Sequence, residues 1–388
     1  MNKISLIILL VTLSACSRAP LKNREDLMRP ASDAPAITDN LSRESFFIAL
    51  RNHIDVMKKS NQVKDPMVFG KKQIPKADYI ASLEKIFDHQ DSWVDYISVN
   101  FESYEVYGKD DWAEVMVTGY YEPKVPGSKT KTKDHFQPAY STPSDMLTID
   151  LKKFSSKFPK GEKLPSLTAR VENKKVVPYY DRKDIDENNK LANQNLELAW
   201  LDPIDAFFIQ IQGTGVIEFE DGEKMRIGYD GQNGHAYFPI GKFLTEHIPL
   251  EEMSMQRIRS HLKTLPFKEQ QTILNKNPSY VFFKKLDGKA ITYAGMEVED
   301  GRTIATDLHL FPKGALAFLD IEEPVFDSEA ATVASVWERK PRLVFDQDTG
   351  GAIKGSGRVD LFYGEGDPAA QKAGVMKQKG KLFYLVPR

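Results

Sequence analysis

The sequence predicts a mainly β fold with some helix, and three observations lead to this prediction. Short runs rich in Val, Ile, Tyr and Phe recur from residue 114 to the C-terminus and stop at Gly or Pro, as strands do. Apolar residues at helical spacing occur near the front and in the middle of the chain. With 41% hydrophobic and 28% charged residues the chain has a soluble, globular composition, and 388 residues suffice for two or three domains.

Helices are expected in three stretches. The first has apolar residues on one face, at Phe46, Phe47, Leu50, Ile54 and Met57. The second begins at Pro75, a favourable first-turn residue, and the third lies between Ile240 and Leu274. Their inward positions are Ile80, Leu83 and Phe87 in the second stretch and Ile258, Leu262 and Leu265 in the third.

Strands are expected in most of the remainder. Residues 114–121 form a β-rich run that stops at Pro123, and a short strand is expected at 176–180. Residues 207–212 and 216–219 flank three small residues, Gly213-Thr214-Gly215, and predict a strand–turn–strand unit. Short strands divided by Gly and Pro are expected again after residue 280.

The N-terminus predicts export and lipidation. Lys3 precedes a ten-residue apolar run that is too short to span a bilayer, and the run ends in Leu13-Ser14-Ala15-Cys16. This pattern is typical of a lipoprotein signal over residues 1–15 with a lipid on Cys16; a plain secretory peptide with a chance cysteine is the alternative. Ser17 favours the outer membrane, with the protein facing the periplasm. Residues 16–40 are expected to form a flexible tether.

Composition also excludes several kinds of chemistry. Cys16 is the only cysteine, so the folded body has no disulfide and no cysteine nucleophile. The seven histidines lack metal-ligand spacing, so we expect no zinc site built from them. A net charge of −2 gives no field that would favour nucleic acid as a partner.

The densest candidate for catalysis is the segment from residue 345 to 364. Its glycines allow the backbone to approach a ligand closely, and two acids, Asp348 and Asp360, lie on either side of Lys354. The apolar residues after Asp360 predict a strand that holds this carboxylate in a partly buried place, where its pKa would rise and it could donate a proton. A Gly-rich turn without function is the alternative. The order of a phosphate-binding loop and the elbow of a serine hydrolase are both absent.

A second cluster has the polar side chains that a sugar chain requires. It consists of residues 205–215 and 231–237, where Gln, Asn, Thr, His and Tyr accompany glycines. Taken singly, these residues are as well explained by turns and structural hydrogen bonds. Likewise, the pair Tyr120-Tyr121 could stack on sugars or pack in a core.

Together these blocks resemble the lytic murein transglycosylase A (MltA) family, over about residues 112–388. The matching blocks are Thr118–Pro123, Gln210–Gly215, Gly231–Tyr237, Asn277–Phe283 and Gln347–Gly355. The aspartate–glycine block is shared with smaller three-aspartate (3D) domains, whereas the Gln-Gly-Thr-Gly and Asn-Gly-His-Ala-Tyr blocks single out this family.

The resemblance implies a double-psi β-barrel with a second β domain inserted into it. Its N-terminal part is expected at residues 41–121, the insert at 122–285 and the C-terminal, 3D part at 286–388. A groove between the domains would bind the peptidoglycan glycan strand. The resemblance also implies that no cofactor is used and suggests cell-wall synthases as further partners.

The resemblance also implies the activity and its residues. Such enzymes cleave the β-1,4 bond between N-acetylmuramic acid and N-acetylglucosamine without water and leave a 1,6-anhydromuramic end. Asp360 is expected to be the acid and base, with Asp348 as a supporting carboxylate, Lys354 orienting it, and Asp367 as a third acid; the reverse order of Asp348 and Asp360 stays open. The expected groove residues are Thr118, Tyr121, Gln212, Gly213, Thr214, Asn233 and His235. The alternatives are a hydrolytic muramidase and a peptidoglycan-binding lipoprotein without activity, and exolytic and endolytic cutting are both open.

Overall fold

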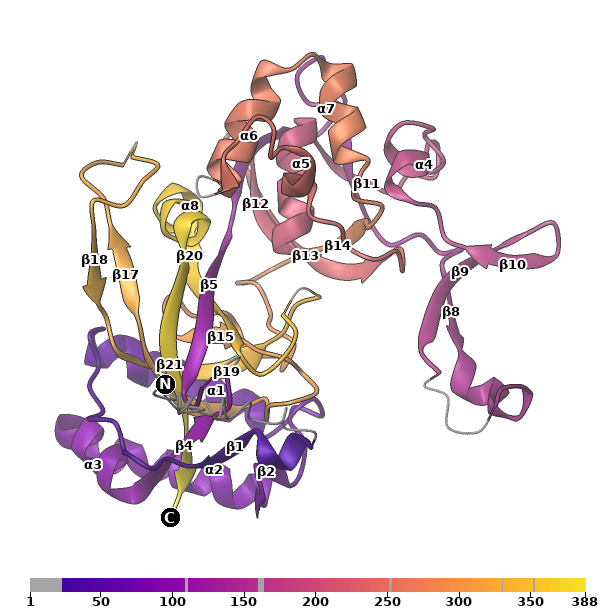
Figure 1. The fold of residues 1–388 in the computed structure, drawn as a ribbon. Helices are drawn as coiled ribbons and strands as arrows, with labels where there is room; N and C mark the ends of the chain where they lie inside the picture. Colours follow the sequence, from indigo (N-terminus) through magenta and orange to yellow (C-terminus); the bar gives the residue numbers. More distant parts are fainter. Residues whose placement is uncertain (1–22, 109–110, 160–163, 251–252, 330, 352) are drawn as a thin grey trace, which may run out of the picture.

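A computed structural model describes residues 23–108, 111–159, 164–250, 253–329, 331–351 and 353–388. Figure 1 shows a barrel with helices at its base, a second β domain above it, and an arm that extends away from both. In the described part of the chain, no helix combines the length and the hydrophobicity that crossing a membrane requires. Cys16 and the predicted signal lie outside the described residues.

The barrel is a closed ring of six strands in the order β5-β20-β15-β19-β16-β21, and it closes because β21 also pairs with β5. Two further strands, β4 and β1, continue the sheet from β21. The bounds are β1 Met28–Pro30, β4 Phe101–Val106, β5 Glu114–Glu122, β15 Thr303–Ala305, β16 Ala315–Asp320, β19 Arg342–Asp348, β20 Arg358–Glu365 and β21 Lys377–Pro387. The prediction of a mainly β fold is confirmed, with a closed six-stranded barrel; its double-psi connection stays a prediction.

Continuous apolar runs explain why these strands form the core. β16 and the middle of β19 are buried along almost their whole length, as expected for strands covered on both sides. The helix α8 (Gly366–Val375) packs directly onto β5 at Gly119. A Cβ atom there would lie 2.8 Å from the Cα of Ala373, so only glycine permits this approach.

Helices cover the base of the barrel (Figure 1). The first predicted helix is confirmed as α1, which is capped by the Ser42 side chain and buries the expected apolar face. The second is confirmed as α2, although the α-helix ends at Glu84 and Phe87 lies in the 3₁₀ segment that follows. The bounds are α1 Arg43–Met57, α2 Lys76–Glu84, η2 Lys85–Ser92 and α3 Trp93–Asn100, with a small hairpin of β2 Met67–Phe69 and β3 Lys72–Ile74.

Residues 23–40 are not a free tether, which corrects the prediction for this part. Met28 is buried in β1, which pairs with β4. The Asp39 carboxylate accepts a hydrogen bond from Arg302 at 2.5 Å, and both side chains are buried. This segment begins with η1 (Arg24–Asp26). Its composition resembles that of a linker, but a few apolar and charged residues are enough to hold it on the barrel.

The second domain is a six-stranded sheet in the order β14-β13-β12-β6-β11-β7, with α5 packed against it and α6 and α7 joined to α5 by a shared apolar cluster. Its strands are β6 Lys124–Ser128, β7 Gln137–Tyr140, β11 Glu197–Leu201, β12 Thr214–Phe219, β13 Lys224–Gln232 and β14 Val281–Leu286. Its helices are α5 Pro203–Gln212, η4 Ile240–Phe243, α6 Met255–Thr264 and α7 Phe267–Leu274. The barrel strands thus come from both sides of this domain in the sequence.

Residues 207–212, predicted as a strand, belong to the helix α5. The Asp202 side chain caps its N-terminus, Pro203 occupies the first turn, and Gly213 ends it in a left-handed conformation, with φ of 78°. The apolar run of Phe and Ile resembles a strand because this helix is buried on nearly every side. Its capping residues were the better signal.

Two smaller projections complete the fold. The arm is a three-stranded sheet, β10-β9-β8, with the bounds β8 Leu147–Asp150, β9 Ser166–Glu172 and β10 Lys175–Pro178, plus η3 Leu151–Lys157. α4 (Arg182–Asp186) follows the arm. A separate hairpin of β17 Glu322–Val325 and β18 Val336–Arg339 extends beside the barrel (Figure 1).

Candidate functional site

The two predicted acids meet through strand register. Ala305 on β15 pairs with Asp348 on one side and with Asp360 on the other, and Asp360 pairs with Thr118. Paired residues in neighbouring strands point to the same face of a sheet, so these four side chains form one row across four strands. Asp348 and Asp360 are two strands apart, which corresponds to about 10 Å between their Cα atoms.

Asp360 lies on β20 and is half-buried. The Thr118 hydroxyl donates a hydrogen bond of 2.7 Å to its Oδ1 atom. Burial raises the pKa of Asp360 to about 6, because the charged form loses water; the bond from Thr118 and the charge of Arg358 oppose this rise. Asp360 is therefore a carboxyl group that keeps its proton in mildly acidic solution and releases it close to neutral pH.

Asp348 is held by more donors. Its Oδ1 atom accepts hydrogen bonds from the backbone N–H groups of Tyr293 and Thr349, at 3.0 and 2.9 Å, and the Tyr120 hydroxyl donates to Oδ2 at 3.1 Å. Burial raises the pKa of Asp348, and these three bonds oppose the rise because each one stabilises the carboxylate. The two acids thus differ: one donor holds Asp360, and three hold Asp348.

A buried polar network supports the end of β19 below this row. The Lys313 ammonium donates to Asp346 at 2.7 Å, and the Thr306 hydroxyl donates to the same carboxylate at 2.7 Å. The backbone N–H of Thr306 also donates to the carbonyl oxygen of Asp348, at 3.1 Å. Because buried polar groups need partners, this network fixes the backbone that carries Asp348.

The predicted groove residues around β5 have structural partners. The Tyr121 side chain is buried against α8 instead of being offered to a sugar. Gln212 accepts a hydrogen bond from the backbone N–H of Tyr121 at 3.3 Å, and Gly213 ends α5. The Thr214 hydroxyl is buried, 2.7 Å from the Glu122 carboxylate. These residues join the second domain to β5 of the barrel.

Asn233 is almost completely buried and uses both ends of its amide. Its Nδ2 atom donates to the carbonyl oxygens of Tyr180 and Pro278, each at 2.9 Å, and its Oδ1 atom accepts from the N–H of Tyr280 at 2.9 Å. His235, which is half-buried, has its Nε2 atom 2.8 Å from the carbonyl oxygen of Tyr179. Both side chains therefore shape the loop that follows β13.

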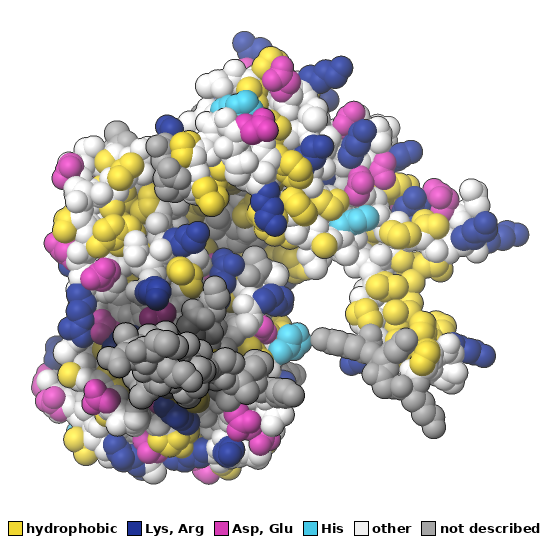
Figure 2. All heavy atoms as spheres, in the orientation of Figure 1, with side chains coloured by type: hydrophobic (Ala, Val, Ile, Leu, Met, Phe, Trp, Pro, Cys, Tyr) yellow, Lys and Arg dark blue, Asp and Glu magenta, His cyan; other side chains and the backbone are white. Residues whose placement is uncertain are grey.

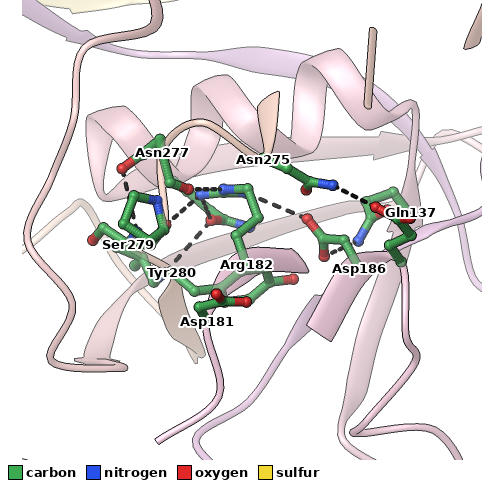
Figure 3. A network of polar contacts seen from close by, with 12 residues as sticks. Gln137, Asp181, Arg182, Asp186, Asn275, Asn277, Ser279 and Tyr280 are labelled. Carbon is green, nitrogen blue, oxygen red and sulfur yellow. Dashed lines mark hydrogen bonds and ion pairs between the residues drawn. The ribbon is translucent and has the colours of Figure 1, made fainter. Parts of the chain in front are cut away.

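Arg182 holds the segment before β14, which in turn bonds Asn233 (Figure 3). Its guanidinium donates to the carbonyl oxygens of Asn277 and Ser279 and to the Gln210 side chain, at 3.0, 2.6 and 2.7 Å. Asp186 completes the group with an ion pair of 3.4 Å, and burial raises its pKa to about 6. Residues of three matching blocks, 210–215, 231–237 and 277–283, are thus joined by one buried network.

The loop after β13 lies within electrostatic reach of Arg358, the neighbour of Thr118. Burial raises the pKa of Tyr237 in this loop, and the charge of Arg358 on β20 lowers it. Arg358 also lies 3.5 Å from the Thr118 hydroxyl, which in turn bonds Asp360. No sequence signal pointed to Arg358, and for Tyr120 the sequence predicted only stacking on sugars or packing in a core. The period of two along a strand places Tyr120 on the same face as Thr118, which is how it reaches Asp348.

Two predicted residues lie away from the acids. Lys354 is exposed, and its charge acts on Asp307, helping to hold the pKa of that carboxyl below its usual value together with the N–H groups of His309 and Gly355. Asp367 is exposed in the first turn of α8. Within the described segments, no group of three or more His, Cys, Asp or Glu side chains is arranged to hold a metal ion.

Comparison with known proteins agrees with this architecture. Residues 116–284 match the model of the MltA specific insert domain, and residues 302–386 match the 3D domain. Membrane-bound lytic murein transglycosylase A of Escherichia coli K12 is 29% identical over 292 residues, which cover 73% of this chain and 69% of that protein. The chain belongs to the MltA family.

Solved structures of the MltA family have the same fold. A membrane-bound lytic murein transglycosylase from Agrobacterium tumefaciens gives a TM-score of 0.72 at 27% identity, covering 89% of this chain and 93% of that one. E. coli MltA with bound chitohexaose gives a TM-score of 0.67 at 22% identity, covering 93% and 94%. At 22% identity, the likeness to E. coli MltA shows a shared fold only. Both matched domains include strands of the candidate site: β5 falls largely in the first, and β15, β19 and β20 in the second.

Proposed function

We propose that this MltA-family enzyme cleaves the β-1,4 bond between N-acetylmuramic acid and N-acetylglucosamine in peptidoglycan without water, leaving a 1,6-anhydromuramic end. The observation that carries the proposal is the state of Asp360. It is a half-buried acid with a pKa of about 6, held by one hydroxyl, in a row with a second carboxyl group. Such a group can both give and take a proton near neutral pH.

In the proposed reaction Asp360 acts twice. Its carboxyl group first donates its proton to the glycosidic oxygen as the bond to the anomeric carbon breaks. The resulting carboxylate then takes the proton of the C6 hydroxyl of the same muramic residue, and that oxygen attacks the anomeric carbon. The proton count closes, since Asp360 ends the cycle protonated and no water is consumed. Thr118 holds the carboxyl group in one orientation throughout.

Asp348 supports the reaction as a carboxylate. Two backbone N–H groups and the Tyr120 hydroxyl favour its charged form. Positive charge develops on the sugar ring as the glycosidic bond breaks, and a fixed negative charge two strands from the donor stabilises it. We assign the donor to Asp360 because fewer donors oppose its protonation.

The second domain is proposed to form the other wall of the glycan site. E. coli MltA, which has the same fold, was solved with bound chitohexaose. The loop after β13 would present the ring of Tyr237, which is 44% exposed, to the glycan. Asn233 and His235 hold the loop in place, and Arg182 holds the segment before β14 that Asn233 bonds. Sugar recognition thus depends on a surface that buried polar residues shape.

We further propose that the mature protein begins at Cys16 and is held by its lipid at the outer membrane, facing the periplasm. The N-terminal sequence supports this proposal. Peptidoglycan glycan strands are the substrate, and cell-wall synthases are proposed as partners that work on the same strands.

Mass analysis of reaction products tests the proposal. Sacculi are digested with the chain from Ser17 to Arg388 and, in parallel, with its Asp360→Ala and Asp348→Ala variants. We expect muropeptides lighter by one water than hydrolytic products, none with Asp360→Ala, and a reduced yield of the same products with Asp348→Ala. Circular dichroism of each variant serves as the folding control.

Other results would redirect the assignment. Products with ordinary reducing ends would identify a hydrolase and overturn the anhydro mechanism. Full loss with Asp348→Ala but residual activity with Asp360→Ala would reverse the two roles. Binding to sacculi that is equal in all three proteins, with no products from any, would identify a binding protein without activity.

A further inference from the structure

The sheet of the arm, residues 143–178, has two chemically distinct faces. Its pairing places Leu147 beside Ala169 and Pro178, Ile149 beside Leu167, and Val171 beside Val176. Since paired and alternate residues share a face, one face is entirely apolar. The side chains of the opposite face, nearly all polar, are Thr148, Asp150, Ser166, Thr168, Arg170, Glu172, Lys175 and Val177.

The polar face is the one that meets the rest of the protein. Gly234, in the loop after β13, approaches Thr168 so closely that a Cβ atom would lie 2.6 Å from the Thr168 Cβ. The Arg170 guanidinium lies over the Tyr180 ring, 4.0 Å from its centre. Among the described residues, the large side chains of the apolar face have no partner outside the arm, and only the small Ala169 between Leu147 and Pro178 is buried.

That apolar face is open to solvent, and Figure 2 shows hydrophobic side chains gathered along the arm. Its large members are Leu147, Leu167, Val171 and Val176, which are 40%, 45%, 60% and 56% exposed. Phe154 on η3, 51% exposed, adds an aromatic ring nearby. A contiguous apolar surface of this kind marks an interaction site more often than isolated exposed side chains do.

Positive charge surrounds the apolar face. The described residues of the arm include six basic and three acidic side chains, a net charge of +3, whereas the whole chain carries −2. The exposed lysines are at both ends of the sheet, namely Lys152, Lys153 and Lys157 on η3 and Lys174 and Lys175 at the β9–β10 turn. The arm is thus basic and amphipathic within a slightly acidic protein.

We propose that the apolar face of the arm docks onto the surface of an anionic lipid bilayer. Valine and leucine side chains would enter the interface while the flanking lysines contact anionic headgroups. A protein partner is less well matched, because protein interfaces concentrate their affinity in Trp, Tyr and Arg anchors, and this face consists of Leu, Ile, Val, Ala and Pro. Docking does not depend on the proposed reaction.

Docking would orient the enzyme as well as hold it. The arm contacts the loop after β13 at Gly234, and the same loop brings Tyr237 near Arg358 beside the acids. If the apolar face of the arm is bound to a bilayer, this loop would therefore keep one orientation relative to the membrane surface. A lipid on Cys16 alone would leave the rotation of the body free.

Vesicle flotation tests the proposal with the chain from Ser17 to Arg388, which carries no lipid. The vesicles contain phosphatidylcholine with 30 mol% phosphatidylglycerol, beside neutral vesicles of phosphatidylcholine alone. We expect binding to the anionic vesicles only, lowered about tenfold by Val171→Thr/Val176→Thr and about fivefold by Lys174→Gln in the β9–β10 turn. Binding should also weaken as salt rises.

The matched control is Val333→Thr/Val336→Thr in the other projection. These valines, 74% and 49% exposed, lie on or beside the β17–β18 hairpin, and their replacement should leave vesicle binding unchanged. Threonine preserves strand propensity, and thermal unfolding of both double variants checks the fold. Equal loss in both variants, or no binding to anionic vesicles, would overturn the proposal. Self-association that only the arm variant abolishes, without vesicle binding, would identify a second copy of the chain as the occupant instead.

Discussion

The two halves of the candidate site use their polar residues in different ways. In the barrel, Asp348 and Asp360 are half-buried, and burial raises the pKa of both carboxyl groups. In the second domain, the side chains of Asn233 and Arg182 donate hydrogen bonds to backbone carbonyl oxygens of the protein itself. The contrast separates residues that can react from residues that hold a surface in place, although all lie in or beside the same sequence blocks.

Asp360→Asn should show the largest effect of any single change on the barrel side. The amide cannot donate a carboxylic proton or become a base, so turnover should fall by about three orders of magnitude. It fills the same space and can still accept from Thr118. Because burial raises the pKa of Asp360, its carboxylate is disfavoured in the folded state at pH 7, so the neutral amide should leave the protein at least as stable to urea. Release of soluble muropeptides from sacculi gives the rate. A loss below tenfold would mean that Asp360 is not the proton donor.

Asn233→Ala should show the opposite pattern in the second domain. Truncation leaves two carbonyl oxygens and the N–H of Tyr280 without their partner in a buried place, which should cost about 3 kcal/mol of unfolding free energy. Urea unfolding followed by circular dichroism measures it. Turnover of the folded fraction should fall less than tenfold, mainly through a higher KM. A variant of unchanged stability with no sugar affinity would make Asn233 a direct ligand and end the contrast.

The residues on which this contrast rests were predicted unequally from the sequence. Asp348 and Asp360 stand out because acids, glycines and a following apolar strand lie together within a short segment. The partners of Asn233, at Tyr180 and Pro278, lie about 50 residues away on either side, so no local pattern could show that its amide is fully used. The sequence block that contains Asn233 could be identified from the sequence, but the structural role of the Asn233 side chain could not.

The fold shows the same limit. The amphipathic period predicted α1 and α2 correctly, whereas α5 was mistaken for a strand because burial on nearly every side hides its period. Closure of the barrel depends on β21 pairing with β5 across more than 250 residues. Register between distant strands sets the row of Asp348, Ala305, Asp360 and Thr118, and no local signal encodes it.

Thr118→Val sharpens the account of the barrel side by changing the pKa of Asp360 while keeping its carboxyl group. In the native protein the bond from the Thr118 hydroxyl favours the charged form of Asp360. Without this bond the pKa of Asp360 should rise from about 6 by about one unit. The protonated acid is the active form, so kcat/KM should now decline with rising pH at a point about one unit higher. A pH profile from 4.5 to 8.5 tests this. A change in rate at every pH, with no shift, would make Thr118 a substrate contact only.

Lys354→Ala should have the smallest effect, under twofold on turnover. Its side chain is exposed and its charge acts on Asp307, so we expect it to have little influence on Asp348. An exposed charge of this kind is screened by salt, which limits its influence on any group farther away. Turnover measured at 50 and 300 mM salt, with Lys313→Met as the comparison, tests this placement, because Lys313 is buried on Asp346 beneath the acids. A tenfold loss with Lys354→Ala would show that the loop carrying it closes over the glycan, so that the reactive half of the site would extend beyond the strands.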